Sequence, residues 1–149
     1  MNKIVLSAFL VFLLAFAHVQ ANPMAEKISM AELMAAVKHA NPLPNFMRVI
    51  QQHKNELDLS EEQNQDVETW IGKHRPTIKE LVLSIREGEK ALAKAALDGA
   101  TKEDMMKQLE GLLEKRREIA SIKMDCRDKM RELLGEDKWQ QIVELYKNM

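Results

Sequence analysis

A cysteine, a histidine and a methionine are the residues of this chain with the clearest capacity for chemistry. Cys126 is the single cysteine among the 149 residues, and Met130 follows it by one helical turn. Thiolate, imidazole and thioether groups are ligands that suit Cu(I) or Zn(II). His74 can join the other two if the chain folds back between positions 74 and 126. These residue types therefore predict a candidate metal site of His74, Cys126 and Met130.

A structural role explains the same residues. His74 can be a polar core residue that bonds to a backbone carbonyl freed near Pro76, and Cys126 can be a small buried side chain. A lone cysteine cannot form a disulfide within the chain, but Cys126 can form an intersubunit disulfide with a second copy. The sequence thus allows a metal site, a buried thiol or a bond between two chains.

Two long helices joined by a tight turn would bring His74 and Cys126 together. Apolar side chains recur at intervals of three and four over residues 67–96 and again over 105–133, as in a coiled-coil seam. Between these segments, Gly99 suits the left-handed conformation that ends a helix, and Thr101 can cap the next one. The pattern predicts an antiparallel helical hairpin.

A turn centred near Gly99 fixes which residues face each other. His74 then faces Cys126, and Gly88 faces Leu112. Arg116 falls within the second apolar seam, where it can pair with Glu89 or with an acid of another chain. The neighbouring bases alternate with acids and predict a solvated, salt-bridged face; they are Lys115, Arg117, Lys123, Arg127, Lys129 and Arg131.

Shorter helices flank the hairpin. One is expected over residues 24–40, ended by Pro42 and Pro44, and a second over 46–55. Gly135 interrupts the second long helix, and a last short helix follows it. The chain has only 5 Gly and 4 Pro, and 5% of its residues are aromatic. The predicted fold class is therefore all-α, a long antiparallel hairpin with short flanking helices, about four helices in all.

The hairpin also predicts an oligomer. Two long helices packed side by side make a thin body, and the short flanking helices can cover only part of its apolar surface. A second copy of the chain is the expected cover for the rest, so we expect a homodimer.

The first residues have the pattern of a Sec-type secretory signal peptide. Lys3 precedes an apolar run over residues 4–17, which is shorter than the roughly 20 residues that span a bilayer. Small residues before position 22 predict cleavage after Ala21. We therefore expect a signal peptide over 1–21, an N-terminal helix and proline-rich linker over 22–44, a helical domain over 45–149, and localisation in the periplasm.

Several function classes lack support in the composition. The formal net charge is −1, which gives no general case for nucleic-acid binding. The sequence contains no glycine-rich phosphate loop, no HExxH and no CxxC. The sequence predicts neither an enzyme nor a nucleic-acid-binding protein.

Two short motifs mark the ends of the hairpin domain. Leu59-Ser60-Glu61-Glu62-Gln63 is a capping box, in which Ser60 and Gln63 can each bond to the other's backbone amide. Leu134-Gly135-Glu136-Asp137-Lys138-Trp139 lies near the C-terminus. With the signal peptide and the hairpin, these motifs resemble the Spy/CpxP family of periplasmic LTxxQ-motif proteins over residues 45–147.

The first motif matches the family more closely than the second. Leu59 and Gln63 are kept, and Ser60 stands where the family has threonine. In the second copy, Leu134 is kept and Trp139 follows where an aromatic residue is common. Gly135 and Lys138 there replace the threonine and the glutamine.

The resemblance implies both a fold and a function. It implies a thin four-helix subunit that pairs antiparallel into a cradle-like homodimer. It also implies an ATP-independent chaperone that binds unfolded or misfolded envelope proteins under envelope stress, with a sensor kinase as a further partner. Metal-binding relatives share the fold, so a periplasmic metal-binding or metal/redox-sensing protein is the alternative.

Overall fold

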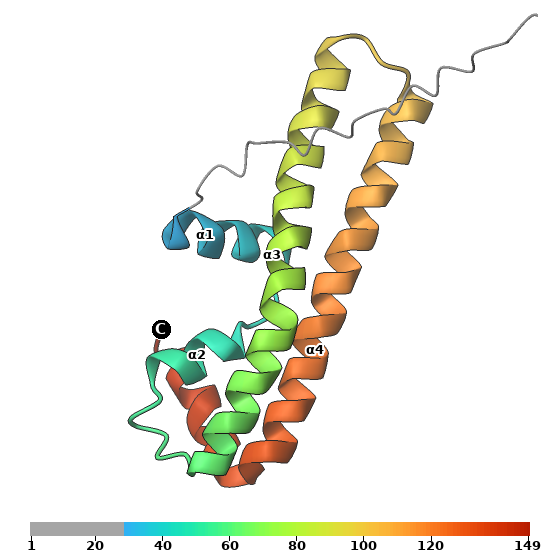
Figure 1. The fold of residues 1–149 in the computed structure, drawn as a ribbon. Coiled ribbons are helices and arrows are strands. Elements are labelled where there is room, and N and C mark those ends of the chain that lie inside the picture. The colour runs from blue at the N-terminus through green and yellow to red at the C-terminus, as the bar shows by residue number, and fades with distance from the viewer. Residues whose placement is uncertain (1–28) are drawn as a thin grey trace, which may run out of the picture.

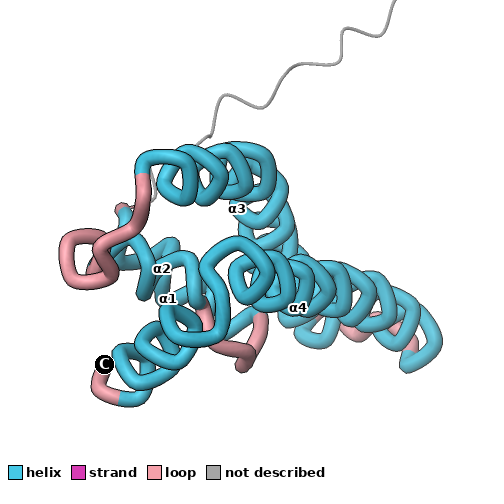
Figure 2. The backbone as a smooth tube through the Cα atoms, turned by 90° about the horizontal axis from the view of Figure 1, so that it is seen from below, coloured by secondary structure: helices cyan, strands magenta, loops and turns pink. Residues whose placement is uncertain are grey.

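The computed structural model describes residues 29–149, and every element in this part of the chain is a helix. In order these are α1 (Met30–Ala40), α2 (Phe46–Gln52), α3 (Glu61–Leu97) and α4 (Lys102–Lys147). The predicted signal peptide and residues 22–28 lie outside the described residues. Helices α3 and α4 pack as an antiparallel hairpin, and α1 and α2 lie on one side of it (Figures 1 and 2). The all-α fold and the long hairpin are confirmed.

The signals that begin and end the long helices are confirmed. Ser60 and Gln63 form the predicted capping box at the start of α3, which continues without interruption through Pro76. Gly99 has φ 80° in the turn, and the Thr101 side chain accepts a hydrogen bond from the Asp104 amide at the start of α4. Local side-chain bonds therefore place the turn between the two helices.

The start of the first helix differs from the prediction. Helix α1 begins at Met30 rather than at residue 24, because Ser29 and Glu32 form a second capping box. The Ser29 hydroxyl accepts from the Glu32 amide, and the Glu32 carboxylate accepts from the Ser29 amide. Helix α2 is also shorter than predicted and ends at Gln52.

Gly135 divides α4 into a long arm (residues 102–134) and a fold-back segment (residues 136–147). Its φ of 75° and ψ of 168° lie in a region open essentially to glycine alone. The chain reverses there and returns toward α2 (Figure 1). In the fold-back segment, the Trp139 ring packs edge-on against Phe46 of α2, with centroids 4.7 Å apart. The predicted interruption thus becomes a reversal that closes one end of the hairpin.

Two clusters of buried residues hold the helices together. The base cluster joins α2, the start of α3 and both parts of α4; it contains Val49, Ile50, Leu57, Val67, Ile71, Cys126, Met130, Leu134, Trp139 and Ile142. The middle cluster joins α1 to the hairpin; it contains Val37, Ala40, Leu81, Val82, Ile85 and Ile119. The distal hairpin beyond these clusters carries no flanking helix from the described part of the chain (Figure 1).

The register of the hairpin agrees with the predicted facing pairs. A methyl group added to Gly88 would lie 2.5 Å from Leu112 Cδ2, so the two helices approach closely at this pair. Arg116 forms the predicted ion pair with Glu89, from within the same chain. Further along, His74 and Cys126 line the same cavity.

Replacing Gly135 with alanine should destabilise the fold. An alanine at this φ and ψ costs about 1–3 kcal/mol, so Gly135→Ala should lower the free energy of unfolding by that amount in urea titration. Gly111→Ala is the matched control, because a methyl group there meets nothing within 4 Å. It should leave stability unchanged or raise it by up to about 1 kcal/mol. Equal effects of the two substitutions would contradict the reversal at Gly135.

Candidate functional site

The predicted motif residues lie together at the base of the hairpin. The Gln63 side-chain oxygen accepts from the Ser60 amide at 3.1 Å, and its Nε2 donates to the Leu133 carbonyl at 3.1 Å. Gln63 therefore joins the start of α3 to the end of the long arm. Leu134 and Trp139 belong to the base cluster, and Leu59 packs against it. These five motif residues hold the base together rather than line an open site.

Lys138 makes a contact that the sequence did not indicate. Its Nζ donates to the carbonyls of Leu57 and Asp58, at 2.7 and 2.6 Å. Asp58 has a left-handed φ of 43° in the loop before α3. The fold-back segment therefore fixes this loop through Lys138.

His74 is tied to its own helix. Its Nδ1 lies 2.9 Å from the Trp70 carbonyl, and its ring stacks on the Trp70 indole with centroids 3.9 Å apart. This differs from the prediction, because the carbonyl that Pro76 frees is that of Gly72, whereas His74 bonds to that of Trp70. Because Nδ1 donates to an oxygen, Nε2 is the ring nitrogen left for a ligand.

Cys126 lies inside the chain. It is 4% exposed, and burial raises the pKa of its thiol to about 12 although the Met47 backbone offers it a hydrogen bond. The thiol is therefore protonated at neutral pH, whereas metal binding and disulfide formation both require the thiolate. Met130 is fully buried in the base cluster and does not line the cavity that His74 and Cys126 share.

No group of three or more histidine, cysteine or acidic side chains within residues 29–149 is arranged to hold a metal ion. The predicted set contains only two side chains of these kinds, His74 and Cys126; its third member, Met130, would supply a thioether. The Cu(I) or Zn(II) site and the intersubunit disulfide at Cys126 stay predictions.

A cavity of about 150 Å³ lies between α1, α2 and the middle of the hairpin. Its walls are mostly apolar and include Met34 of α1, Met47 of α2, Ile78 of α3 and Ile122 of α4. Three cationic side chains of α2 and α3 also line it, namely Arg48, Arg75 and Lys79, together with Lys123 of α4. Among residues 29–149, no acidic side chain lines it.

Lys123 corrects the prediction of a solvated basic face. It is 8% exposed, and its Nζ donates to the carbonyls of Asn41 and Leu43 at 3.0 and 2.7 Å. Burial lowers the pKa of this ammonium from 10.5 to about 8. Three other bases of that stretch do pair with acids as predicted: Arg127 with Asp128, Lys129 with Glu132 and Arg131 with Glu136.

Arg116 also bonds to the chain near the linker, at the end of α1. Its guanidinium donates to the carbonyls of His39 and Ala40, at 2.9 and 3.0 Å, as well as pairing with Glu89. These carbonyls close α1, where the helix dipole favours a cation. Arg116 and Lys123 are two helical turns apart on α4, but only Arg116 lies in the predicted apolar seam, so the sequence contains a signal for Arg116 and none for Lys123.

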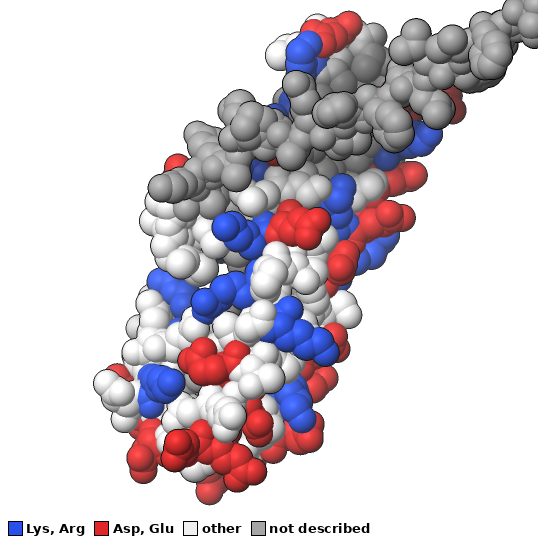
Figure 3. Space-filling view, in the orientation of Figure 1, with Lys and Arg blue, Asp and Glu red and all other residues white. Residues whose placement is uncertain are grey.

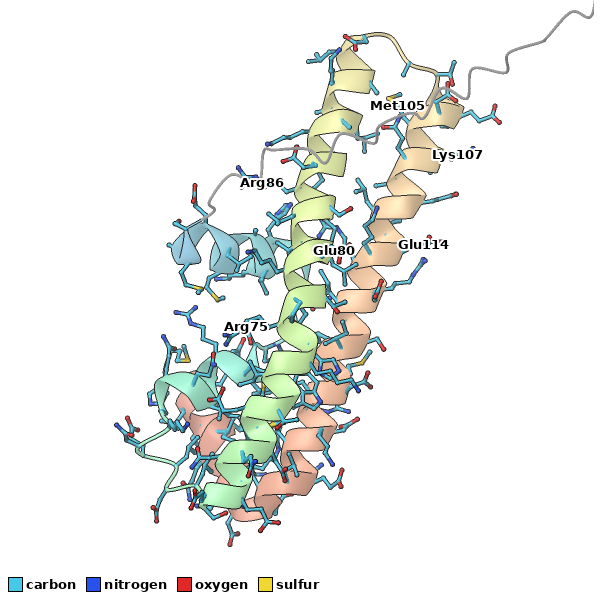
Figure 4. All side chains as sticks on the ribbon, in the orientation of Figure 1. Arg75, Glu80, Arg86, Met105, Lys107 and Glu114 are labelled. Carbon is cyan, nitrogen blue, oxygen red and sulfur yellow. The ribbon has the colours of Figure 1, made fainter. Side chains whose placement is uncertain are left out.

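A second apolar site lies on the distal hairpin. A groove of about 500 Å³ runs between the end of α3 and the start of α4, and most of its lining area is apolar. Figure 4 shows Met105 between the two helices near the turn. Lining residues of the groove are Glu89, Leu92, Ala93, Ala96, Lys102, Met105, Met106, Leu109, Leu112 and Arg116.

Comparisons of the chain with protein-family models, with curated proteins and with solved structures found no match. None of the described helices combines the length and the apolar character that crossing a membrane requires.

Stability should respond to pH through Cys126. The unfolded thiol ionises near pH 9 and the folded one near pH 12, so the folded chain holds one more proton between these values. Raising the pH therefore favours unfolding. Relative to Cys126→Ala, the wild-type free energy of unfolding should fall by roughly 1.4 kcal/mol per pH unit above pH 9.

Urea titrations at several pH values between 8 and 11 measure this difference. The titration of Lys123 acts in the opposite direction, but it is common to both proteins and cancels in their difference. A difference that does not change with pH would show that the Cys126 thiol is not desolvated.

Proposed function

We propose that this chain is a periplasmic, ATP-independent chaperone-like protein that binds unfolded or misfolded clients under envelope stress. The observation that carries the proposal is the distal groove. It is wide, shallow and apolar, and it lies on the part of the hairpin that no described flanking helix covers. A folded domain gains nothing from such a surface unless something binds there.

The composition of the groove suits many different partners. Met105 and Met106 are flexible and polarizable side chains that adapt to irregular apolar surfaces. Ala93 and Ala96 leave room for a bulky client side chain between them. Contacts of this kind bind diverse sequences weakly and release them, which a chaperone without an ATP cycle requires.

Charged residues frame the apolar floor. Lys102 lies at the turn end of the groove, and the Arg116–Glu89 pair lies at the other end. Both signs of charge are therefore present, so the groove does not require clients of one charge. We propose that exposed apolar segments of unfolded chains are the ligands.

The sequence features agree with this function. The signal-peptide pattern of residues 1–21 directs the chain to the envelope, and the motif residues at the base resemble those of the Spy/CpxP family. We propose membership of that family and an antiparallel, cradle-like homodimer. Exposed apolar side chains on the hairpin support a second copy as partner; they include Leu97 and Leu113.

A matched pair of methionines on α4 tests the groove. Met106 lines it and is 46% exposed, whereas Met124 lies outside it and is 45% exposed. The mature wild-type chain should suppress aggregation of a chemically denatured model protein, followed by light scattering. Met106→Gln should need at least about threefold more protein for half-maximal suppression, because it removes part of an apolar contact of about 1 kcal/mol or more.

Met124→Gln should behave as wild type in the same assay. The proposal would be wrong if the wild-type chain suppressed the aggregation of none of several clients at any salt concentration. It would also be wrong if both substitutions weakened suppression equally, since the groove would then play no special part.

A further inference from the structure

The cavity between α1 and α2 is separate from the distal groove and has no part in the proposed function. Helices α1 and α2 each pack on the hairpin, through α3 and α4 respectively, and the proline-containing linker joins them. Arg116 and Lys123 hold the carbonyls of that linker and of the end of α1. The cavity is therefore built by specific bonds rather than left by loose packing.

The apolar interior of the cavity has a defined size. Its volume of about 150 Å³ matches an apolar protein cavity known to take up benzene, so about six carbon atoms of an alkyl chain fit inside, and the head group with the carbons next to it lies at the side that is open to solvent. Two methionines from facing helices, Met34 and Met47, form adaptable walls, and Trp70 adds a flat one. A single short alkyl chain fits this space, and a two-chain lipid does not.

The charged side chains that line the cavity from residues 29–149 are all cationic. Arg75 and Lys79 are one turn apart on α3, so both head groups can reach one anion. Arg75 donates to the neutral Gln51 side chain at 3.0 Å, which holds its guanidinium between α2 and α3 while other N–H groups stay available. Figure 4 shows Arg75 in the space between α1 and α2, and Figure 3 shows Lys and Arg gathered at that height.

We propose that this cavity binds a single-chain amphiphile with an anionic head group, of which a medium-chain carboxylate is the simplest example. The alkyl chain lies among Met34, Met47 and Ile78, and the head group accepts hydrogen bonds from Arg75 and Lys79. An uncharged chain would gain no bond from these two solvent-exposed cations, and a cationic amphiphile would be repelled. The lining residues of the described part of the chain include cations and no acid, which favours the anion over both.

Isothermal titration calorimetry of the mature chain with four probes tests the proposal. Octanoate carries both the chain and the charge, octanol the chain alone, octylammonium the opposite charge and acetate the charge alone. Octanoate should bind at least about tenfold more tightly than octanol, because charge-assisted bonds contribute about 1.5–3 kcal/mol each. Octylammonium and acetate should give no measurable binding.

Substitutions on α3 separate the cavity from general charge effects. The double variant Arg75→Gln/Lys79→Gln should lose at least about tenfold in octanoate affinity and keep the weak octanol binding, which also reports that the cavity is still folded. Lys73→Gln removes a charge from the same helix outside the cavity and should bind octanoate as wild type does. In a Trp139→Phe background, Trp70 is the one tryptophan left, and the change of its fluorescence on adding octanoate should be large for the parent chain and for Lys73→Gln and small for the double variant.

Three results would overturn the proposal. Equal affinities for octanoate and octanol would show that the cations do not select the ligand. Unchanged octanoate binding in the double variant would place the ligand elsewhere. Binding to anionic phospholipid vesicles without any binding of octanoate would indicate a membrane surface rather than a cavity. Met106→Gln should leave octanoate binding unchanged, so failure of this proposal and failure of the proposed function are distinguishable.

Discussion

The close approach of α3 and α4 at Gly88 is the constraint on which the rest of the structure depends. A methyl group at position 88 would force the Leu112 side chain to move, so glycine lets Leu112 fill this point of the seam as it does. The Gly99 turn sets the same register from the end of the hairpin. Once that register is fixed, Glu89 meets Arg116, and the apolar side chains further along meet in two clusters.

Two cations of α4 attach α1 and the linker to the hairpin and so shape both candidate sites. Arg116 and Lys123 bind carbonyls of α1 and the linker, where backbone groups would otherwise lack partners. Burying Lys123 is unfavourable, as its lowered pKa indicates, but two carbonyl oxygens compensate its charge. This anchor holds α1 near the middle of the hairpin, so the cavity lies on one side of it and the distal groove stays uncovered.

The hairpin, its turn and the Gly135 interruption could be predicted because each depends on local residue types and on the period of the apolar residues. The position of α1 could not, because it depends on contacts of single side chains with distant carbonyls. Lys123 shows the reason: the sequence places it among exposed bases, and only the path of the linker buries it. The bond from Lys138 to the Leu57 carbonyl likewise forms only because the chain reverses at Gly135, and the bond from Gln63 to the Leu133 carbonyl forms just before that reversal.

A double-mutant cycle on Gly88 and Leu112 tests the register most directly. The free energy of unfolding is measured for wild type, Gly88→Ala, Leu112→Ala and the double variant. A new methyl group at position 88 meets Leu112 but has space beside an alanine, so Gly88→Ala should be more favourable by about 1 kcal/mol or more in the Leu112→Ala background. Effects that add within about 0.5 kcal/mol would show that these residues do not touch and would contradict the register.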